Sequence, residues 1–287
     1  MNRVDLKHVP LKPANPFSGW LPKIHRVIFG IFLLQWTLVW ARLWLPYSVF
    51  GEARWPEGLL VVLTTATTLT ALQRHLPGQN VMGASIAIAV LGGGAHMLGA
   101  LTAIPFGPFE YTSHVGQRLF GPLPWAIPMI WIVVVLNARG VGRLMLRRWR
   151  QAPQYGFWLL GLTVLLVVLM ELGLEVFGTH IKAYWSWETT KLPWDWYGTP
   201  VVNFLGWAVT TGLILGFIIP MLISKHPTPP PPDYHPLVVW LLLNLLFLTG
   251  AALRHLWLAV AIIAIHCVLV TALAIQRKRA STLRQGT

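Results

Sequence analysis

The chain has 287 residues, of which 55% are hydrophobic and 11% are charged, and its formal net charge is +13. A soluble domain usually carries about 25% charged residues, so this composition excludes an ordinary soluble domain. The basic residues stand between apolar runs, where they orient membrane helices, and we therefore expect no nucleic-acid partner. The composition predicts an all-α, polytopic integral membrane protein.

Apolar runs long enough to cross a bilayer predict a bundle of about eight transmembrane helices. The expected spans cover residues 27–45, 58–73, 81–104, 123–138, 156–178, 201–223, 236–253 and 256–276. Most of the 22 Lys and Arg residues fall between alternate spans, so the positive-inside rule predicts that both termini are cytoplasmic. We expect the protein to lie in a bacterial-type inner membrane.

Composition divides the chain into a membrane core and additions at either end. The expected units are a polar N-terminal segment (1–26), a six-helix core carrying the site (27–224), a proline-rich connector (225–235), a C-terminal helical hairpin (236–276) and a basic tail (277–287). The connector is expected to form a stiff polyproline segment that separates the hairpin from the core.

A pair of glutamates stands inside one of the membrane-length apolar runs. Glu171 and Glu175 are four residues apart, so on a helix both side chains face the same side. Ionisable groups inside a membrane are costly and are usually functional. Two buried neighbouring carboxyl groups also favour keeping one of them protonated, as an acid. The structural alternative is a pair neutralised by arginine or by hydrogen bonds between helices.

Polar residues on two other predicted helices reach the depth of this pair. At 1.5 Å per residue, Glu171 lies about 10 Å and His96 about 12 Å below the outer ends of their helices, and Asn203 lies near the outer end of a third. His96 suits a base, a hydrogen-bond partner of Glu171 or a metal ligand, or it is a buried core histidine. Asn244 and His266 have no such company, and we expect them to form interhelical hydrogen bonds.

Two aromatic loops, 105–122 and 179–200, are predicted on the non-cytoplasmic side above these groups. Tryptophan and tyrosine are typical of a membrane-interface belt. Dense clusters beside acids also suit a site in which ring faces, such as those of Trp185 and Trp187, stabilise a carbocation. The candidate substrate-binding residues are Tyr111, His114, Tyr184, Trp185, Trp187, Tyr197, Asn203 and Trp207. The candidate catalytic residues are Glu171, Glu175, His96 and Glu110.

Two further patterns indicate helix packing. Gly92, Gly93 and Gly94 let another helix approach closely, or leave room for a flat ligand. The threonines of the 64–70 run are expected to bond to their own backbone or to neighbouring helices. Metal spacings such as HxxxH, HExxH or paired cysteines are absent from the sequence, as are phosphate loops and nucleotide fingerprints. We therefore expect no metal, no cofactor, and a reaction on a lipid that needs only protons and water.

Two blocks of sequence resemble the CruF-type carotenoid hydratases, a membrane family of carotenoid biosynthesis. The first block contains IPFGPFEYT (104–112) and GPLPWAIP (121–128), and the second contains YWSW (184–187) and YGTPVVNFLGW (197–207). The resemblance covers roughly residues 90–210. It implies an enzyme that adds water across the terminal double bond of an acyclic carotenoid end, giving a tertiary alcohol without a cofactor.

Hydration of a trisubstituted alkene needs a protonated donor and a water molecule held by a base. We expect Glu171 to be the donor, with Glu175 or His96 holding the water. Glu110 and Tyr111 are expected to complete the polar mouth of the site.

The chain departs from the family pattern at a few positions. His96 stands where the family has an acidic residue. Glu171 and Glu175 stand where the family has aspartates, and Val176 replaces the proline that follows the second of them. These differences leave the substrate and the direction of the reaction open.

Two other classes of function stay open. A non-catalytic subunit or carrier would grip a carotenoid or another isoprenoid with the tryptophan clusters, and its acids would be structural. A proton- or metal-coupled transporter would use the acids as a relay, but the chain lacks the Gly- or Pro-interrupted spans in two matching halves that are typical of transporters. The expected partners are carotenoids or other isoprenoid lipids, membrane lipids, and other carotenoid-pathway or pigment-binding membrane proteins.

Overall fold

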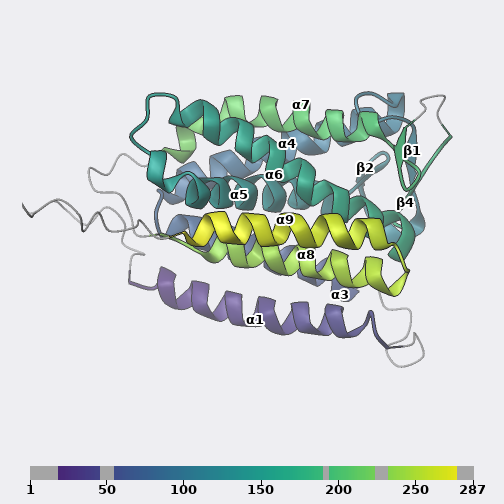
Figure 1. The fold of residues 1–287 in the computed structure, drawn as a ribbon, viewed down its shortest axis with the longest axis horizontal. Helices are drawn as coiled ribbons and strands as arrows, with labels where there is room; N and C mark the ends of the chain where they lie inside the picture. The colour runs from purple at the N-terminus through teal and green to yellow at the C-terminus, as the bar shows by residue number, and fades with distance from the viewer. Residues whose placement is uncertain (1–18, 46–54, 190–193, 224–231, 277–287) are drawn as a thin grey trace, which may run out of the picture.

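The fold is a bundle of long helices that lie roughly side by side (Figure 1). A computed structural model describes residues 19–45, 55–189, 194–223 and 232–276. Its α-helices are α1 (Leu21–Ala41), α3 (Trp55–Gln73), α4 (Gly78–Thr102), α5 (Ala126–Met145), α6 (Tyr155–Val176), α7 (Val201–Ile218), α8 (His235–Leu253) and α9 (Trp257–Ile275). Most of the predicted N-terminal segment and connector, and the whole basic tail, lie outside the described residues, so the division into units stays a prediction.

Within the described residues, seven helices are long and apolar enough to cross a membrane, as expected for a polytopic all-α bundle. They are all the helices named above except α3. We expected a span at 58–73, inside α3, but Glu57 and the threonines of this helix lower its hydropathy. The orientation of the bundle in the membrane stays a prediction.

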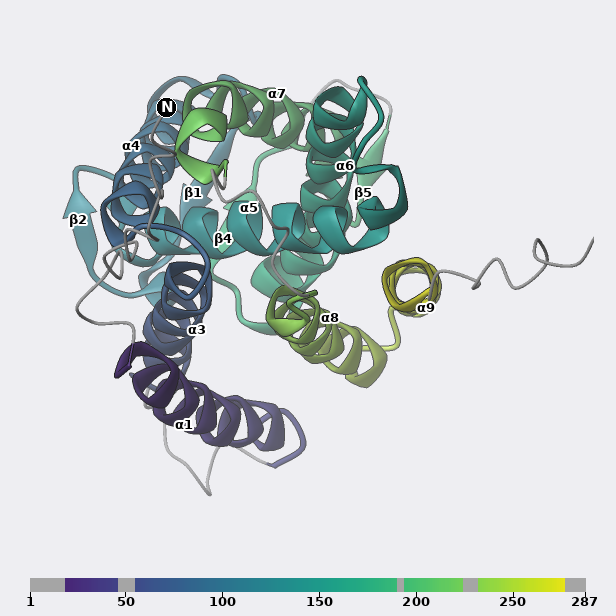
Figure 2. The ribbon, with the colours of Figure 1, turned by 90° about the vertical axis from the view of Figure 1, so that its left-hand side faces the viewer.

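Helix α5 forms the centre of the bundle. Of the most apolar stretch of this helix, 72% is buried inside the structure, a larger share than in any other candidate span. It contacts α3, α4, α6, α8 and α9, and the end-on view in Figure 2 shows these helices around it, with α1 farther out beyond α3. Two cavities described below adjoin this central helix. The cavity that holds the glutamate pair lies at its start, and a cavity lined by arginines lies at its end.

Several polar residues inside the bundle are paired as expected, although the hydroxyl of Thr67, in the same run of threonines, has no partner among the described residues. The hydroxyl of Thr64 donates to the carbonyl of Leu60 (2.6 Å), and Asn137 Nδ2 donates to Thr68 Oγ1 across α3 and α5 (2.9 Å). Hydrogen bonds of this kind satisfy groups that would be costly to bury unpaired. His266 Nε2 and Asn244 Oδ1 lie 3.0 Å apart, which confirms the predicted interhelical hydrogen bonding of α8 and α9.

Short strands join the loops at one end of the bundle, a feature that we did not predict. They pair antiparallel as β1 (Phe109–Tyr111) with β4 (Trp185–Trp187), β2 (Arg118–Phe120) with β3 (Leu123–Pro124), and β5 (Asp195–Trp196) with β6 (Thr199–Pro200). The β1–β4 pair draws its strands from the two aromatic loops, so these loops form one structure at the end of the bundle (Figure 1).

Candidate active site

Glu171 and Glu175 lie at the end of α6 next to the β1–β4 pair. Their side chains are only 1% and 3% exposed. Asn203, in the first turn of α7, joins them, because its Nδ2 donates to Glu171 Oε1 (3.2 Å) and to Glu175 Oε1 (3.1 Å). The two carboxyl groups therefore lie close together around one amide nitrogen, and two neighbouring buried carboxyl groups favour keeping a proton on one of them.

Glu175 is held by donors from the loops as well as from α7. Its Oε2 accepts hydrogen bonds from Trp185 Nε1, Trp187 Nε1 and Thr199 Oγ1, each at 3.0 Å. An ionised carboxylate has acceptor sites for all of these donors together with Asn203, and their dipoles stabilise its negative charge. These donors therefore favour the carboxylate form at Glu175 more than the surroundings of Glu171 do.

Glu171 is much less engaged. Its Oε1 accepts the single bond from Asn203, and among the described residues its buried Oε2 has no partner. Buried polar atoms are nearly always hydrogen-bonded to protein or to water, so a free buried oxygen marks a place where a ligand or water binds. The asymmetry of the pair assigns the proton to Glu171 and the charge to Glu175.

His96, on α4, faces this pair together with Tyr111 of β1. Tyr111 Oη and His96 Nδ1 lie 3.1 Å apart, and His96 Nε2 is buried without a partner among the described residues. Burial, and to a smaller extent the two glutamates, raises the pKa of the Tyr111 phenol well above its ordinary value, so the phenol keeps its proton. With Tyr111 as the donor, a neutral His96 carries its own proton on Nε2.

Aromatic rings enclose His96. Phe106 stacks on its imidazole with ring centroids 4.4 Å apart, and Trp207 lies edge-on at 5.4 Å. Trp131, from the second turn of α5, stacks on Trp207 with ring centroids 4.0 Å apart. These rings make the surroundings of the polar groups apolar and fix the orientation of the imidazole.

The polar groups surround a small cavity of about 20 Å³. A cavity of this size holds about one water molecule. The lining residues are His96, Phe109, Tyr111, Ile127, Ile130, Glu171, Leu174, Glu175, Trp185, Trp187, Asn203 and Trp207. The sequence-based convergence of Glu171, His96 and Asn203 at one depth is thus present in the structure as a shared cavity.

A larger cavity of about 960 Å³ adjoins the small one. The two cavities share Ile130, Leu174 and Trp185 as wall residues, so these side chains separate them. The wall of the larger cavity comes mainly from α3, α5 and the two loops, and it is mostly apolar. Glu57, which accepts a hydrogen bond from Lys182 Nζ (2.6 Å), also lines it.

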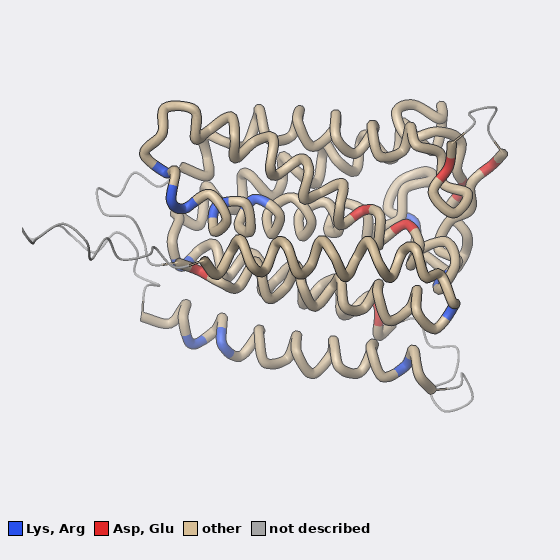
Figure 3. The backbone as a smooth tube through the Cα atoms, viewed as in Figure 1, with Lys and Arg blue, Asp and Glu red and all other residues tan. Residues whose placement is uncertain are grey.

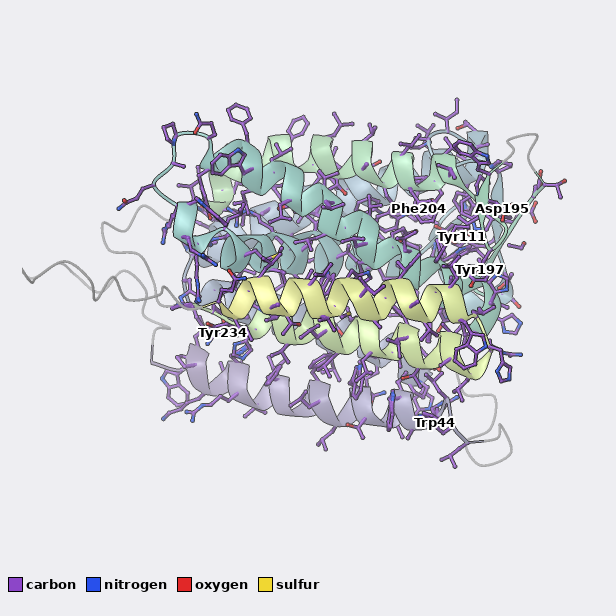
Figure 4. All side chains as sticks on the ribbon, in the orientation of Figure 1. Trp44, Tyr111, Asp195, Tyr197, Phe204 and Tyr234 are labelled. Carbon is purple, nitrogen blue, oxygen red and sulfur yellow. The ribbon has the colours of Figure 1, made fainter. Side chains whose placement is uncertain are left out.

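Four predicted site residues lie outside the small cavity. His114 and Tyr184 line the larger cavity instead. Tyr197 lies in the turn between β5 and β6, where its hydroxyl accepts from the backbone N–H of Ala259 (3.3 Å) and so links this turn to α9. Glu110 is exposed, because it is the middle residue of β1 and its neighbours in the strand face inward. Figure 4 shows Tyr111 and Tyr197 at the same end of the bundle.

Thr199 and Trp131 belong to the site and were not among the predicted residues. Thr199 is 1% exposed and donates to Glu175, which depends on the turn between β5 and β6. Trp131 stands in an apolar run like any other core residue. Thr199 lies within the second block of family resemblance (197–207), which is the signal that could have found it, whereas no sequence signal distinguishes Trp131. In the described part of the chain, no group of three His, Cys, Asp or Glu side chains is arranged to hold a metal ion.

The Glu110→Gln variant is expected to keep full activity and stability. Glu110 is exposed on β1 and its side chain lies away from the cavity that holds the glutamate pair, so neutralising it changes no buried interaction. Product formation by membranes that contain equal amounts of the two proteins checks this expectation. A large loss of turnover would return Glu110 to the catalytic group.

Taken together, the fold and the site define a polytopic membrane protein with a buried carboxyl pair beside an apolar cavity. The chain belongs to the carotenoid biosynthesis protein family, which it matches over residues 57–271. It is also 29% identical over 127 residues to the bisanhydrobacterioruberin hydratase of Haloarcula japonica, a match that covers 44% of this chain and 41% of that relative. The chain thus spans well under half of that relative. No solved structure matches the chain.

Proposed function

We propose that the protein is a carotenoid hydratase, which adds water to the terminal double bond of an acyclic carotenoid end. The observation that carries this proposal is the unequal bonding of the two glutamates around a cavity of one-water size. Hydration needs an acid and a base at the same time, and two carboxyl groups in unequal surroundings supply both. The name of the archaeal relative, itself a hydratase, supports the same reaction class.

In the proposed reaction, Glu171 is the acid. Its proton moves to the less substituted carbon of the terminal double bond, and the π electrons form the new C–H bond. A tertiary cation is left on the other carbon. The faces of Trp187 and Trp207, which line the cavity, stabilise this charge.

Water completes the reaction. A lone pair of the water oxygen forms a bond to the cationic carbon, while His96 Nε2 donates a hydrogen bond that orients the water. One water proton passes to the Glu175 carboxylate. Because both carboxyl groups accept from Asn203 Nδ2 and so lie close together, the proton then returns from Glu175 to Glu171, and the pair is restored with a tertiary alcohol as product.

The larger cavity is the proposed position of the rest of the polyene. The small cavity holds water but is too small for a terminal isoprene unit. The end of the substrate would therefore enter through the wall formed by Ile130, Leu174 and Trp185, which is common to both cavities. Side-chain rotation of Ile130 and Leu174 opens this wall without breaking a hydrogen bond.

The proposed function is tested by expressing the chain in a bacterial host that accumulates lycopene and analysing the pigments by liquid chromatography and mass spectrometry. A product heavier by one water with an unchanged chromophore is expected, because the terminal double bond is outside the conjugated system. A host with the empty vector is the control. Unmodified lycopene that copurifies with the protein would instead support a carrier.

The Val61→Trp variant is expected to raise KM more than it lowers kcat. Val61 lines the larger cavity and does not touch the glutamate pair, so a bulky ring there would exclude the polyene without changing the acid or the base. Steady-state rates in liposomes with graded substrate check this. Val90→Trp is the matched control, because Val90 is 65% exposed on the outer surface of α4. Equal effects of the two variants would contradict a polyene site in this cavity.

A further inference from the structure

Arginines line a cavity at the end of the bundle opposite the glutamate pair. Figure 3 shows Lys and Arg gathered at this end and most of the acidic residues at the other. The cavity has a volume of about 140 Å³, which is large enough for more than a single water molecule. Arg139, Arg143, Arg147 and Arg150, from the end of α5 and the turn after it, all contribute to its wall. Tyr155, the first residue of α6, and Pro236, the second residue of α8, also line it.

Within the described part of the chain, no free acidic side chain balances the positive charge of this cavity. Among the described residues, none of the four arginines forms an ion pair. Arg139 is 7% exposed and uses Nη2 to donate to the carbonyl of Leu222 (3.0 Å), which leaves other N–H groups of its guanidinium available. Arg147 donates to the hydroxyl of Tyr234 (3.1 Å), at this same end of the bundle (Figure 4), and to the carbonyl of Gln276, and both of these partners are neutral.

Asp233 is the single acidic side chain that the described residues place in this wall, and it is already occupied. Arg74 Nη2 and His235 Nδ1 both lie 3.0 Å from its carboxyl oxygens, and His75 Nε2 lies at 3.4 Å. Burial alone would raise the pKa of Asp233, but the hydrogen bonds from His235 and His75 and the charge of Arg74 hold it well below its ordinary value. Asp233 therefore stays ionised, and its charge is already paired with Arg74 and the two histidines.

An arginine that only orients a membrane helix needs no cavity. Arg148 illustrates this, because it is exposed, lies outside the cavity wall and stacks over the ring of Trp149 at 5.5 Å. Arg139 and Arg143 are four residues apart on α5 and so share a face of that helix. Arg147 and Arg150 reach the same cavity from the turn after α5. Guanidinium groups match phosphate oxygens with paired N–H donors, and basic pockets between the ends of membrane helices bind lipid phosphates.

We propose that this cavity binds a phosphate group, with the headgroup of an anionic phospholipid as its source. The site is separate from the glutamate pair and does not depend on the proposed hydratase activity, since the two cavities share no wall residue. The bound phosphate would join α5, the start of α6 and the start of α8, and so stabilise the end of the bundle.

Native mass spectrometry of the purified full-length chain in detergent tests this proposal. Wild-type protein is expected to retain added phosphatidylglycerol more tightly than phosphatidylcholine. Loss of one arginine's charge-assisted hydrogen bonds is expected to weaken the phosphatidylglycerol complex about tenfold. Arg143→Gln and the more exposed Arg150→Gln are the two test variants, and Arg148→Gln is the matched control with the same change in charge.

A separate arm identifies the source of the phosphate. Inorganic phosphate at high concentration is expected to leave the phosphatidylglycerol complex intact; displacement by phosphate that is lost in Arg143→Gln would assign the site to the free anion. Thermal unfolding of each variant without lipid shows that it is folded. The proposal is overturned if Arg148→Gln weakens lipid binding as much as Arg143→Gln, or if wild-type protein does not prefer phosphatidylglycerol.

Discussion

Glu171→Gln is expected to lower the hydration rate by a factor of about 10² to 10⁴, the usual contribution of a general acid or base. The glutamine side chain has the same shape and still accepts the hydrogen bond from Asn203 through its carbonyl oxygen. Its amide cannot transfer a proton to an alkene, however. The variant should therefore fold, bind pigment and fail to protonate it.

The measurement is product formation in a lycopene-accumulating host, read together with the amount of pigment that copurifies with the variant. Retained pigment with lost turnover separates a catalytic role from a structural one. Glu188→Gln is the matched control, because Glu188 is an exposed glutamate in the loop just after β4. Full turnover by Glu171→Gln would remove Glu171 from the role of proton donor.

Glu175→Gln is a less direct test of the same mechanism. The Glu175 carboxylate accepts hydrogen bonds from two tryptophans, a threonine and an asparagine. An amide NH₂ in place of Oε2 would face three donors, and each unmatched buried donor costs about 1–3 kcal/mol. Loss of activity in this variant would therefore combine a missing base with a disrupted site. A substitution of Glu171 tests the mechanism more directly.

The depth of the polar groups could be predicted because helix geometry is regular. A rise of 1.5 Å per residue places any residue at a known distance from the end of its span, so Glu171, His96 and Asn203 were expected at one level without knowledge of how the helices pack. The small cavity that these three residues line shows that the inference was sound. Seven of the eight expected spans coincide with helices that are long and apolar enough to cross a membrane, because such runs are recognised by length and hydropathy alone.

The loops could not be predicted in the same way, because side-chain direction there depends on strand register. In β1, adjacent residues face opposite sides, so whether Glu110 or Tyr111 points inward depends on how β1 pairs with β4. The pairing of Tyr111 with Trp185 directs the phenol to His96 and leaves Glu110 exposed. Thr199 reaches Glu175 for a similar reason, through the β5–β6 turn.

Gly92→Ala is expected to cost about 1–3 kcal/mol of stability, the usual range for overpacking a core, and to impair activity. A Cβ atom at Gly92 would lie 2.3 Å from the indole of Trp131, so the ring must move. Trp131 has little freedom to do so, because it is fully buried and stacks on Trp207, a wall residue of the small cavity. The added methyl group would therefore shift the wall that faces His96. Thermal unfolding in detergent and product formation measure the two effects.

Gly94→Ala supplies the comparison within the same run of glycines. A Cβ atom at Gly94 meets nothing within 4 Å, since this residue is exposed on the outer side of α4. Alanine there is expected to leave stability and activity unchanged, although the chemical change and the helix are the same. A difference between the two variants would show that the glycines allow the close approach of α5. Equal effects would mean that the run acts through the flexibility of α4. They would also mean that the stack of Trp131 on Trp207 tolerates an added methyl group.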